Sequence, residues 1–165
     1  MRRIGLLSDT HSFLDPKVFT HFEDCHEIWH AGDFGEIQVA ESLLQFRPLK
    51  GVYGNIDGPE IKALFPLNQN FEIEGFKVRI IHIGGYPGHY PKLLKESLKQ
   101  DPCTLFICGH SHILRVIQDP DLGMLTINPG AAGKHGFHHI RTIMKFDLSE
   151  GKIDAMKVIE LGKRA

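Results

Sequence analysis

Short apolar runs alternate with polar segments along the whole chain, and most have the length of a β-strand. Nine runs rich in aliphatic and β-branched residues predict strands. They cover Ile4–Leu7, Ile28–Trp29, Val52–Tyr53, Phe71–Ile73, Val78–Ile83, Thr104–Cys108, Leu114–Ile117, Leu125–Ile127 and Ile140–Phe146. Turn residues at Asp121–Gly123 and Glu150–Gly151 predict hairpins late in the chain.

Three segments between these runs have the apolar spacing of helices. They are Pro16–Phe22, which follows a favourable N-cap residue at Asp15, then Ile37–Phe46 and Tyr90–Gln100. Helices and strands alternate in the first half of the chain, and strands dominate the second half. This order predicts an α/β fold with more than one sheet, and 165 residues suit a single domain over 1–165.

Polar side chains that can bind metals stand at or near the carboxyl ends of five of these runs. They are Asp9, His11, Asp33, Asn55, His82, His110 and His112. Loops after such strand ends converge in open α/β sheets, so we expect these side chains to form one cluster. Taken alone, each has a simpler explanation. The aspartates would serve as helix or turn caps and His82 as a core histidine, and a turn at Gly109 would separate the two histidines that follow it.

The chemistry of this set favours a metal centre. Carboxylate, amide and imidazole groups without thiolate suit Mn, Fe, Co, Ni or Zn better than Ca or Mg. Seven groups exceed the ligand number of one tetrahedral zinc, which is about four. They fit two ions about 3.5–4 Å apart that share Asp33, an arrangement that hydrolyses phosphate esters.

Composition and charge narrow the function further. Lys and Arg total 19 against 20 for Asp and Glu. Because the chain has no excess of basic residues, its charge does not indicate a nucleic-acid partner. No apolar stretch is long enough for a signal-peptide core or a membrane span. The three cysteines form no CxxC pair, which predicts reduced thiols, Cys108 in the core and a cytoplasmic location. Of the other histidines, His21, His26 and His30 should be surface or packing residues. The loop after "NPG" carries His135, His138 and His139, which could approach a substrate but are not expected to be metal ligands.

Read in order, DTH, GD, GN, a lone histidine and GHSH resemble the five sequence blocks of the calcineurin-like metallophosphoesterases. GLLSDTH near the start and NPGAAG at 128–133 make the chain similar to the small single-domain phosphodiesterase branch. That branch includes bacterial and archaeal enzymes and the non-catalytic retromer scaffold subunit. The resemblance implies a four-layer sandwich, in which two mixed β-sheets pack face to face and helices flank them.

The resemblance also implies how the ligands are divided. The first ion would be held by Asp9, His11, Asp33 and His112, and the second by Asp33, Asn55, His82 and His110. Manganese is the first choice, with Ni, Fe, Co or Zn as alternatives. A hydroxide between the ions would attack a small-molecule or nucleotide-like phosphodiester. Asp33, Asn55 and Asp57 are the candidate catalytic residues. Membrane and nucleic-acid partners are not expected, and assembly into a homo-oligomer stays open.

The chain departs from the family pattern in two places. Many phosphatases of the superfamily carry a leaving-group histidine where this chain has Ile56, and the small branch, which also lacks it, tends toward diesters. His82 is followed by Ile83 where glycine is usual, and His89 or Tyr90 in the loop beyond is a candidate for the missing acid. The alternative function is a weakly active or inactive protein-binding scaffold. The intact ligand set argues against it.

Overall fold

The computed structural model describes residues 1–165 and contains two five-stranded sheets. The first sheet has the order β10-β9-β1-β2-β3. Its strands are β1 (Arg2–Leu7), β2 (Glu27–His30), β3 (Leu49–Gly51), β9 (Ile140–Ser149) and β10 (Lys152–Lys163). Since β1, β2 and β3 are parallel, they all end at the same edge of this sheet. The strands β9 and β10 are antiparallel additions beside β1.

The second sheet has the order β4-β5-β6-β8-β7. Its strands are β4 (Asn68–Ile73), β5 (Phe76–Ile81), β6 (Leu105–Ile107), β7 (Arg115–Asp119) and β8 (Met124–Asn128). The three central strands are parallel, and β4 and β7 pair antiparallel at the two edges. Both sheets are therefore mixed, as predicted.

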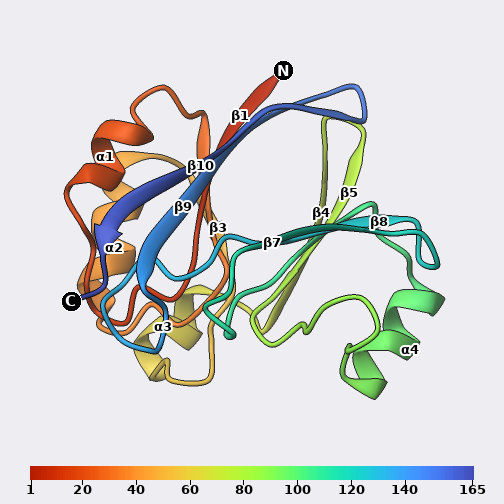
Figure 1. The fold of residues 1–165 in the computed structure, drawn as a ribbon, viewed down its shortest axis with the longest axis horizontal. Coiled ribbons are helices and arrows are strands. Elements are labelled where there is room, and N and C mark those ends of the chain that lie inside the picture. Colours follow the sequence, from red (N-terminus) through yellow and green to blue (C-terminus); the bar gives the residue numbers. More distant parts are fainter.

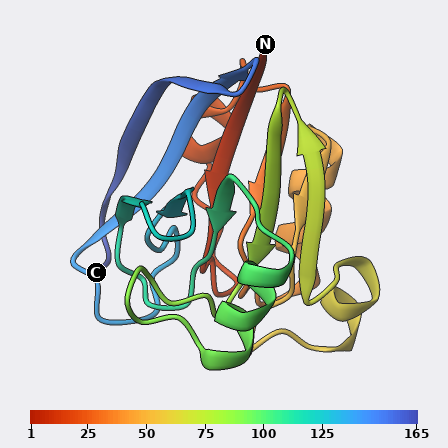
Figure 2. The same ribbon diagram turned by 90° about the vertical axis from the view of Figure 1, so that its right-hand side faces the viewer.

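Three apolar clusters hold four layers together. The cluster between the sheets contains Leu6, Trp29, Ile80 and Ile107, all fully buried. A second cluster joins the first sheet to α1 (Lys17–His21), α2 (Ile37–Phe46) and α3 (Pro59–Leu64), and a third joins the second sheet to α4 (Lys92–Gln100). Figures 1 and 2 show α4 on the opposite side of the molecule from α1 and α2. The arrangement matches the predicted sandwich, because each sheet covers one apolar face with the other sheet and one with helices.

Several predicted boundaries need correction. The third strand lies at Leu49–Gly51, just before the predicted Val52–Tyr53. Pro16 takes the N-cap position of α1, and the Asp15 carboxylate instead accepts hydrogen bonds from the Lys17 amide (2.9 Å) and from Arg141 (2.8 Å). Two elements were not predicted. One is the helix α3, which is only six residues long. The other is the strand β10, in which two register shifts break the alternation of apolar and polar residues.

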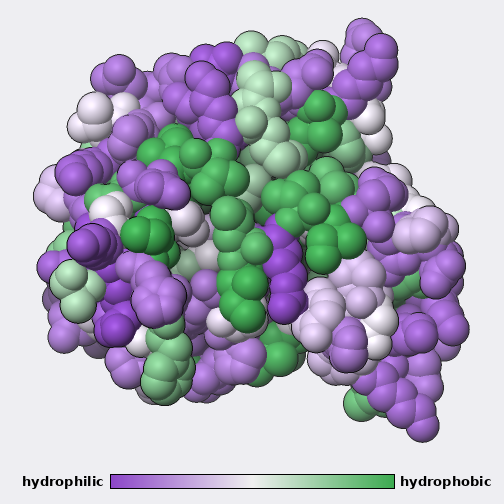
Figure 3. All heavy atoms as spheres, in the orientation of Figure 1, coloured by the Kyte–Doolittle hydropathy of each residue, from purple (hydrophilic) through white to green (hydrophobic).

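The surface of the molecule carries some exposed apolar side chains. Hydrophobic residues gather in the middle of the face in Figure 3, over β10 and β7. Both strands carry partly exposed aliphatic side chains, Val158 on β10 and Val116 and Ile117 on β7. No helix has the length and apolar character needed to cross a membrane.

The three cysteines are free and buried. Cys108 packs in the apolar cluster beneath α4, which confirms its predicted place in the core.

Candidate metal centre

The seven predicted ligands lie in loops that directly follow five strands. The loops after β1, β2 and β3 carry Asp9, His11, Asp33 and Asn55, and those after β5 and β6 carry His82, His110 and His112. The two sheets therefore supply ligands from opposite sides of one site. The predicted convergence of these side chains at strand ends is confirmed.

The first group of ligands comprises Asp9, His11 and His112, whose ligand atoms lie within 4.8 Å of one another. Asp9 Oδ1 is 3.1 Å from His112 Nε2 and 3.7 Å from His11 Nε2. His11 Nε2 is also 3.4 Å from Asp33 Oδ2. These three carboxylate and imidazole groups thus surround a space of the size that one metal ion needs.

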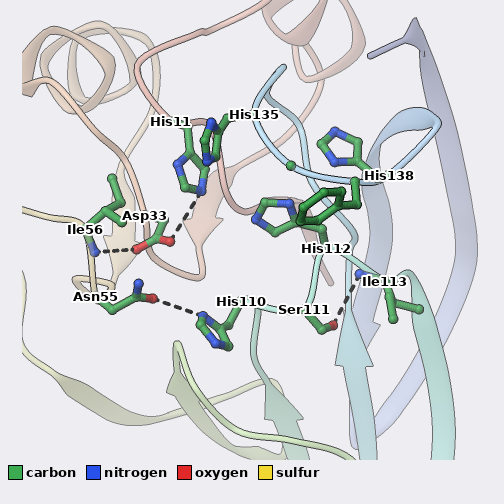
Figure 4. Close-up of a pocket in the computed structure, with 12 residues that line it drawn as sticks. His11, Asp33, Asn55, Ile56, His110, Ser111, His112, Ile113, His135 and His138 are labelled. Atoms are coloured by element: carbon green, nitrogen blue, oxygen red, sulfur yellow. Dashed lines mark hydrogen bonds and ion pairs between the residues drawn. The ribbon is translucent and has the colours of Figure 1, made fainter. Parts of the chain in front are cut away.

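The second group comprises Asp33, His82 and His110, also within 4.8 Å. Asp33 Oδ2 is 3.2 Å from His82 Nε2. Asn55 Oδ1 lies 3.1 Å from His82 Nε2 and 3.0 Å from His110 Nδ1. Figure 4 shows Asp33 between His11 and Asn55. One carboxylate therefore faces histidines of both groups.

The donor atoms of this site are suited to a cation. Asp9 Oδ1 and His11 Nε2 are buried, face each other and have no hydrogen-bond partner. His82 Nδ1 lies 2.7 Å from the Ala31 carbonyl and must donate to it, so a neutral ring turns the lone pair of Nε2 toward Asp33. Such a hydrogen bond to the far nitrogen is typical of metal-ligating histidines. The residues therefore fit divalent metal ions.

The electrostatics of the site lead to the same conclusion. Burial by itself raises the pKa of Asp9, but the close imidazoles of His11 and His112 outweigh it and hold that pKa well below its usual range. The pKa of Asp33 is also held well below its usual range by the imidazoles of His11 and His82, although burial raises it. Asp33, and after it Asp9, raises the pKa of His11 to about 9. The two buried carboxylates thus create a negative potential that favours a bound cation.

The backbone of the site is strained. Nine residues other than glycine have a positive φ, and five of them are Asp9, His11, Asp33, His110 and His112. The left-handed conformation costs an L-residue about 1–2 kcal/mol and is found where a functional geometry requires it. At His110 (φ 69°) and His112 (φ 60°) it sends the two rings to different ligand groups. The predicted turn after β6 is thus made by the histidines and not by Gly109.

The absence of a side chain at Gly109 leaves space for the carboxylate of Asp9. A Cβ atom at this position would lie 2.7 Å from Asp9 Oδ2. Gly54 is constrained in the same way, because a Cβ there would lie 2.7 Å from the Asp33 carboxyl carbon. These two glycines let the carboxylates approach the neighbouring loops closely.

Asp57 was expected among the catalytic residues, and its position argues against that. Its buried carboxylate accepts hydrogen bonds from the amides of Phe34 (3.2 Å), Gly35 (2.9 Å) and Gly54 (2.7 Å). It does not line the cavity of the site. Asp57 therefore fastens the loop that carries Asp33 to the loop that carries Asn55, and it does not face a reacting group.

Asn128 is a supporting residue that the sequence reasoning did not identify, although it begins the NPGAAG segment. Its side-chain amide donates to the Gly109 carbonyl (2.9 Å) and to Ser111 Oγ (3.1 Å), and its Oδ1 accepts from Gly130 N (3.0 Å). These hydrogen bonds of Asn128 therefore stabilise the turn that carries His110 and His112.

Other histidines and Tyr90 were also considered in the sequence, and the structure places them inside or outside the cavity. His30 is a packing residue, as predicted: it is fully buried and stacked on Phe34, and burial lowers its pKa to about 3. The expectation for His89 and Tyr90 was wrong, since neither lines the cavity and the Tyr90 hydroxyl donates to Asp119 (2.7 Å). His135 and His138 do line it, whereas His139 does not.

A cavity of about 490 Å³ opens over both ligand groups. Its lining includes His11, Asp33, Asn55, His110 and His112. Ile56 and Ile113 lie on opposite sides of these histidines in Figure 4. A small substrate can therefore reach the ligands directly from solvent.

Comparison with known proteins identifies the family. The sequence matches the calcineurin-like phosphoesterase superfamily domain over residues 1–151. A "probable metallophosphoesterase" of Methanothermobacter thermautotrophicus is 33% identical over 138 residues, covering 78% of this chain and 76% of that protein. The structure of a novel archaeal phosphodiesterase has a TM-score of 0.77 at 26% identity, covering 96% of this chain and 99% of the other. Vps29 from Chaetomium thermophilum has a TM-score of 0.76 at 16% identity, covering 99% and 100%.

These matches agree with the two ligand groups and with the two-sheet sandwich. The chain belongs to the calcineurin-like phosphoesterase superfamily and is a metal-dependent phosphoesterase.

Proposed function

We propose that this phosphoesterase hydrolyses phosphodiesters at a centre of two divalent metal ions. The observation that carries the proposal is the position of Asp33, whose Oδ2 lies 3.4 Å from His11 Nε2 and 3.2 Å from His82 Nε2. A carboxylate placed this way would be shared between two ions. The first would be held by Asp9, His11, Asp33 and His112, and the second by Asp33, Asn55, His82 and His110. Manganese is the first candidate, with Ni, Fe, Co and Zn as alternatives.

The two ions would supply an activated water and neutralise charge on the phosphoryl group. The chain has to hold and orient the ester. Asn55 is exposed at the cavity and is the residue best placed to orient a phosphoryl oxygen with its amide. Ile56 follows it, 46% exposed, and has no proton to donate to a leaving group. Esters with a leaving group that needs little protonation are therefore the preferred substrates.

The test of this function is Ile56→His, assayed on aryl diesters and alkyl monoesters. The wild type should hydrolyse aryl phosphodiesters and turn over alkyl monoesters poorly, because general-acid assistance is worth about 10²–10⁴-fold. The new imidazole should raise monoester turnover relative to diester turnover. Metal content of both proteins, measured by elemental analysis, must be equal, since a change in occupancy would imitate a change in specificity. A wild type that prefers alkyl monoesters would refute the proposed specificity.

The division of ligands predicts different outcomes for the two histidines after β6. His110→Ala should chiefly deplete the second ion, because His110 faces Asn55. His112→Ala should chiefly deplete the first, because His112 faces Asp9. Metal titration followed by calorimetry on both variants measures this directly. Identical losses at both sites would contradict the division.

A scaffold role is the alternative, and the Vps29 structures have the same fold. Two features of this chain favour the enzyme. Seven groups capable of binding metals lie around one site, five of them line a solvent-open cavity, and five of the seven hold strained backbone conformations. Protein binding alone would require neither feature.

A further inference from the structure

The loop after β8 reaches the metal site and carries an exposed aromatic ring there. His135 stacks on His11 with ring centroids 4.8 Å apart, and His138 packs edge-on against His112 at 5.2 Å. His138 Nε2 also donates to the Gly133 carbonyl (2.8 Å). Phe137 lies between these two anchors and lines the cavity, yet it is 98% exposed.

The backbone next to Phe137 is fixed. Gly136 has a φ of +128°, and a Cβ atom there would lie 2.7 Å from Cε1 of His112. The chain therefore passes directly against a proposed ligand, and only glycine fits. Figure 4 shows His135 beside His11 and His138 near His112, so the loop is attached to the site on both sides of residue 137. Phe137 is thus presented by an anchored segment.

Two further apolar side chains line the cavity, among residues that are otherwise polar or glycine. Ile56 is 46% exposed and Ile113 is 49% exposed, and both line the cavity with Phe137. No lysine or arginine is among the lining residues. An organic group that extends from a phosphoryl group at the metal centre toward the loop after β8 would meet the exposed ring of Phe137. A group with further phosphates would meet no cation in this cavity.

We propose that Phe137 forms a subsite for a flat apolar group, the aryl or heteroaromatic ester group of a substrate with a single phosphoryl centre. The proposal rests on the proposed function only in placing the phosphoryl group at the metal centre. Aromatic rings bind each other face to face with an offset or edge to face, and a ring that is exposed beforehand gains by leaving water.

The experiment compares the binding of phenylphosphonate and methylphosphonate to the metal-loaded protein by calorimetry. The wild type should bind the phenyl compound about tenfold more tightly, which is the size of one favourable aromatic contact. Phe137→Ala should remove this preference and leave methylphosphonate binding unchanged, and Phe137→Tyr should retain the preference. Leu93→Ala on α4 removes an apolar side chain that is 79% exposed and remote from the cavity lining, so it is the matched control.

Equal affinity for the two phosphonates in the wild type would overturn the subsite, and so would a preference that survives Phe137→Ala or disappears in Leu93→Ala. Failure of both phosphonates to bind would overturn it as well. Because binding is measured without turnover, the outcome is separate from the test of the proposed function. A wild type that binds phenylphosphonate selectively but hydrolyses no diester would refute the diesterase and retain the subsite. In an active enzyme, Phe137→Ala should raise KM for aryl diesters with little change in kcat.

Discussion

Asp33→Asn should remove most of the bound metal from both sites and lower phosphodiesterase activity by about 10³-fold or more. The reason is that the Asp33 carboxylate faces His11 in one ligand group and His82 in the other. An amide is a weaker, neutral ligand and cannot replace a shared anion. The fold should survive, because Asp33 Oδ1 accepts a hydrogen bond from Ile56 N (3.1 Å) and the amide oxygen of asparagine can accept the same bond.

Elemental analysis, phosphodiesterase assays and circular dichroism on the same preparations measure these effects. Asp154→Asn is the matched control, since Asp154 is exposed on β10. It should keep full metal content and activity. If Asp33→Asn retains two ions and normal activity, the bridging role is wrong. Loss of one ion only would place Asp33 in a single site.

Asp57→Ala should have the largest effect on stability, a loss of about 3–5 kcal/mol. Its carboxylate accepts three backbone N–H groups, and alanine would leave those donors without their acceptor beneath the site. For a domain of this size the midpoint of thermal unfolding should fall by about 10 °C. The loops of Asp33 and Asn55 would also separate, so metal affinity should fall together with stability.

Asp57→Asn is the informative companion, because one amide oxygen can still accept part of this network. It should be intermediate in thermal stability when the proteins are compared by scanning calorimetry. Equal stability of wild type and Asp57→Ala would show that water satisfies these amides and that the carboxylate does not fasten the loops.

The sequence indicated the proposed ligands because their signal is local. Each follows an apolar strand, and the carboxyl ends of such strands meet. The roles of Asp57 and Asn128 could not be obtained in this way. Asp57 binds the amides of Phe34 and Gly35, more than 20 positions earlier, and Asn128 binds the Gly109 carbonyl. Which amides and carbonyls lie opposite a polar side chain depends on how the two sheets pack, and no pattern along the chain encodes that.

The same limit applies to the secondary structure. The amphipathic spacing of α2 gave its bounds correctly, since that helix covers a sheet with one face. The edge strand β10 has one well-buried residue, Leu161, and two register shifts, so it has no regular alternation to detect. Its pairing with β9 comes from the hairpin at Glu150–Gly151, which was predicted from turn chemistry alone.

The left-handed backbone at five of the proposed ligands links this protein's folding to metal supply. Without an ion, the folded chain bears the conformational cost of these residues and the burial of Asp9 Oδ1 and His11 Nε2 without a hydrogen-bond partner. An ion that binds only the folded state offsets both, so the apparent stability rises with the logarithm of free metal concentration. Removal of the metal by a chelator should therefore lower the local stability of these loops before it affects the rest of the sandwich. Directed evolution for thermostability without metal would then be expected to accumulate glycine at these positions, and with it a loss of activity.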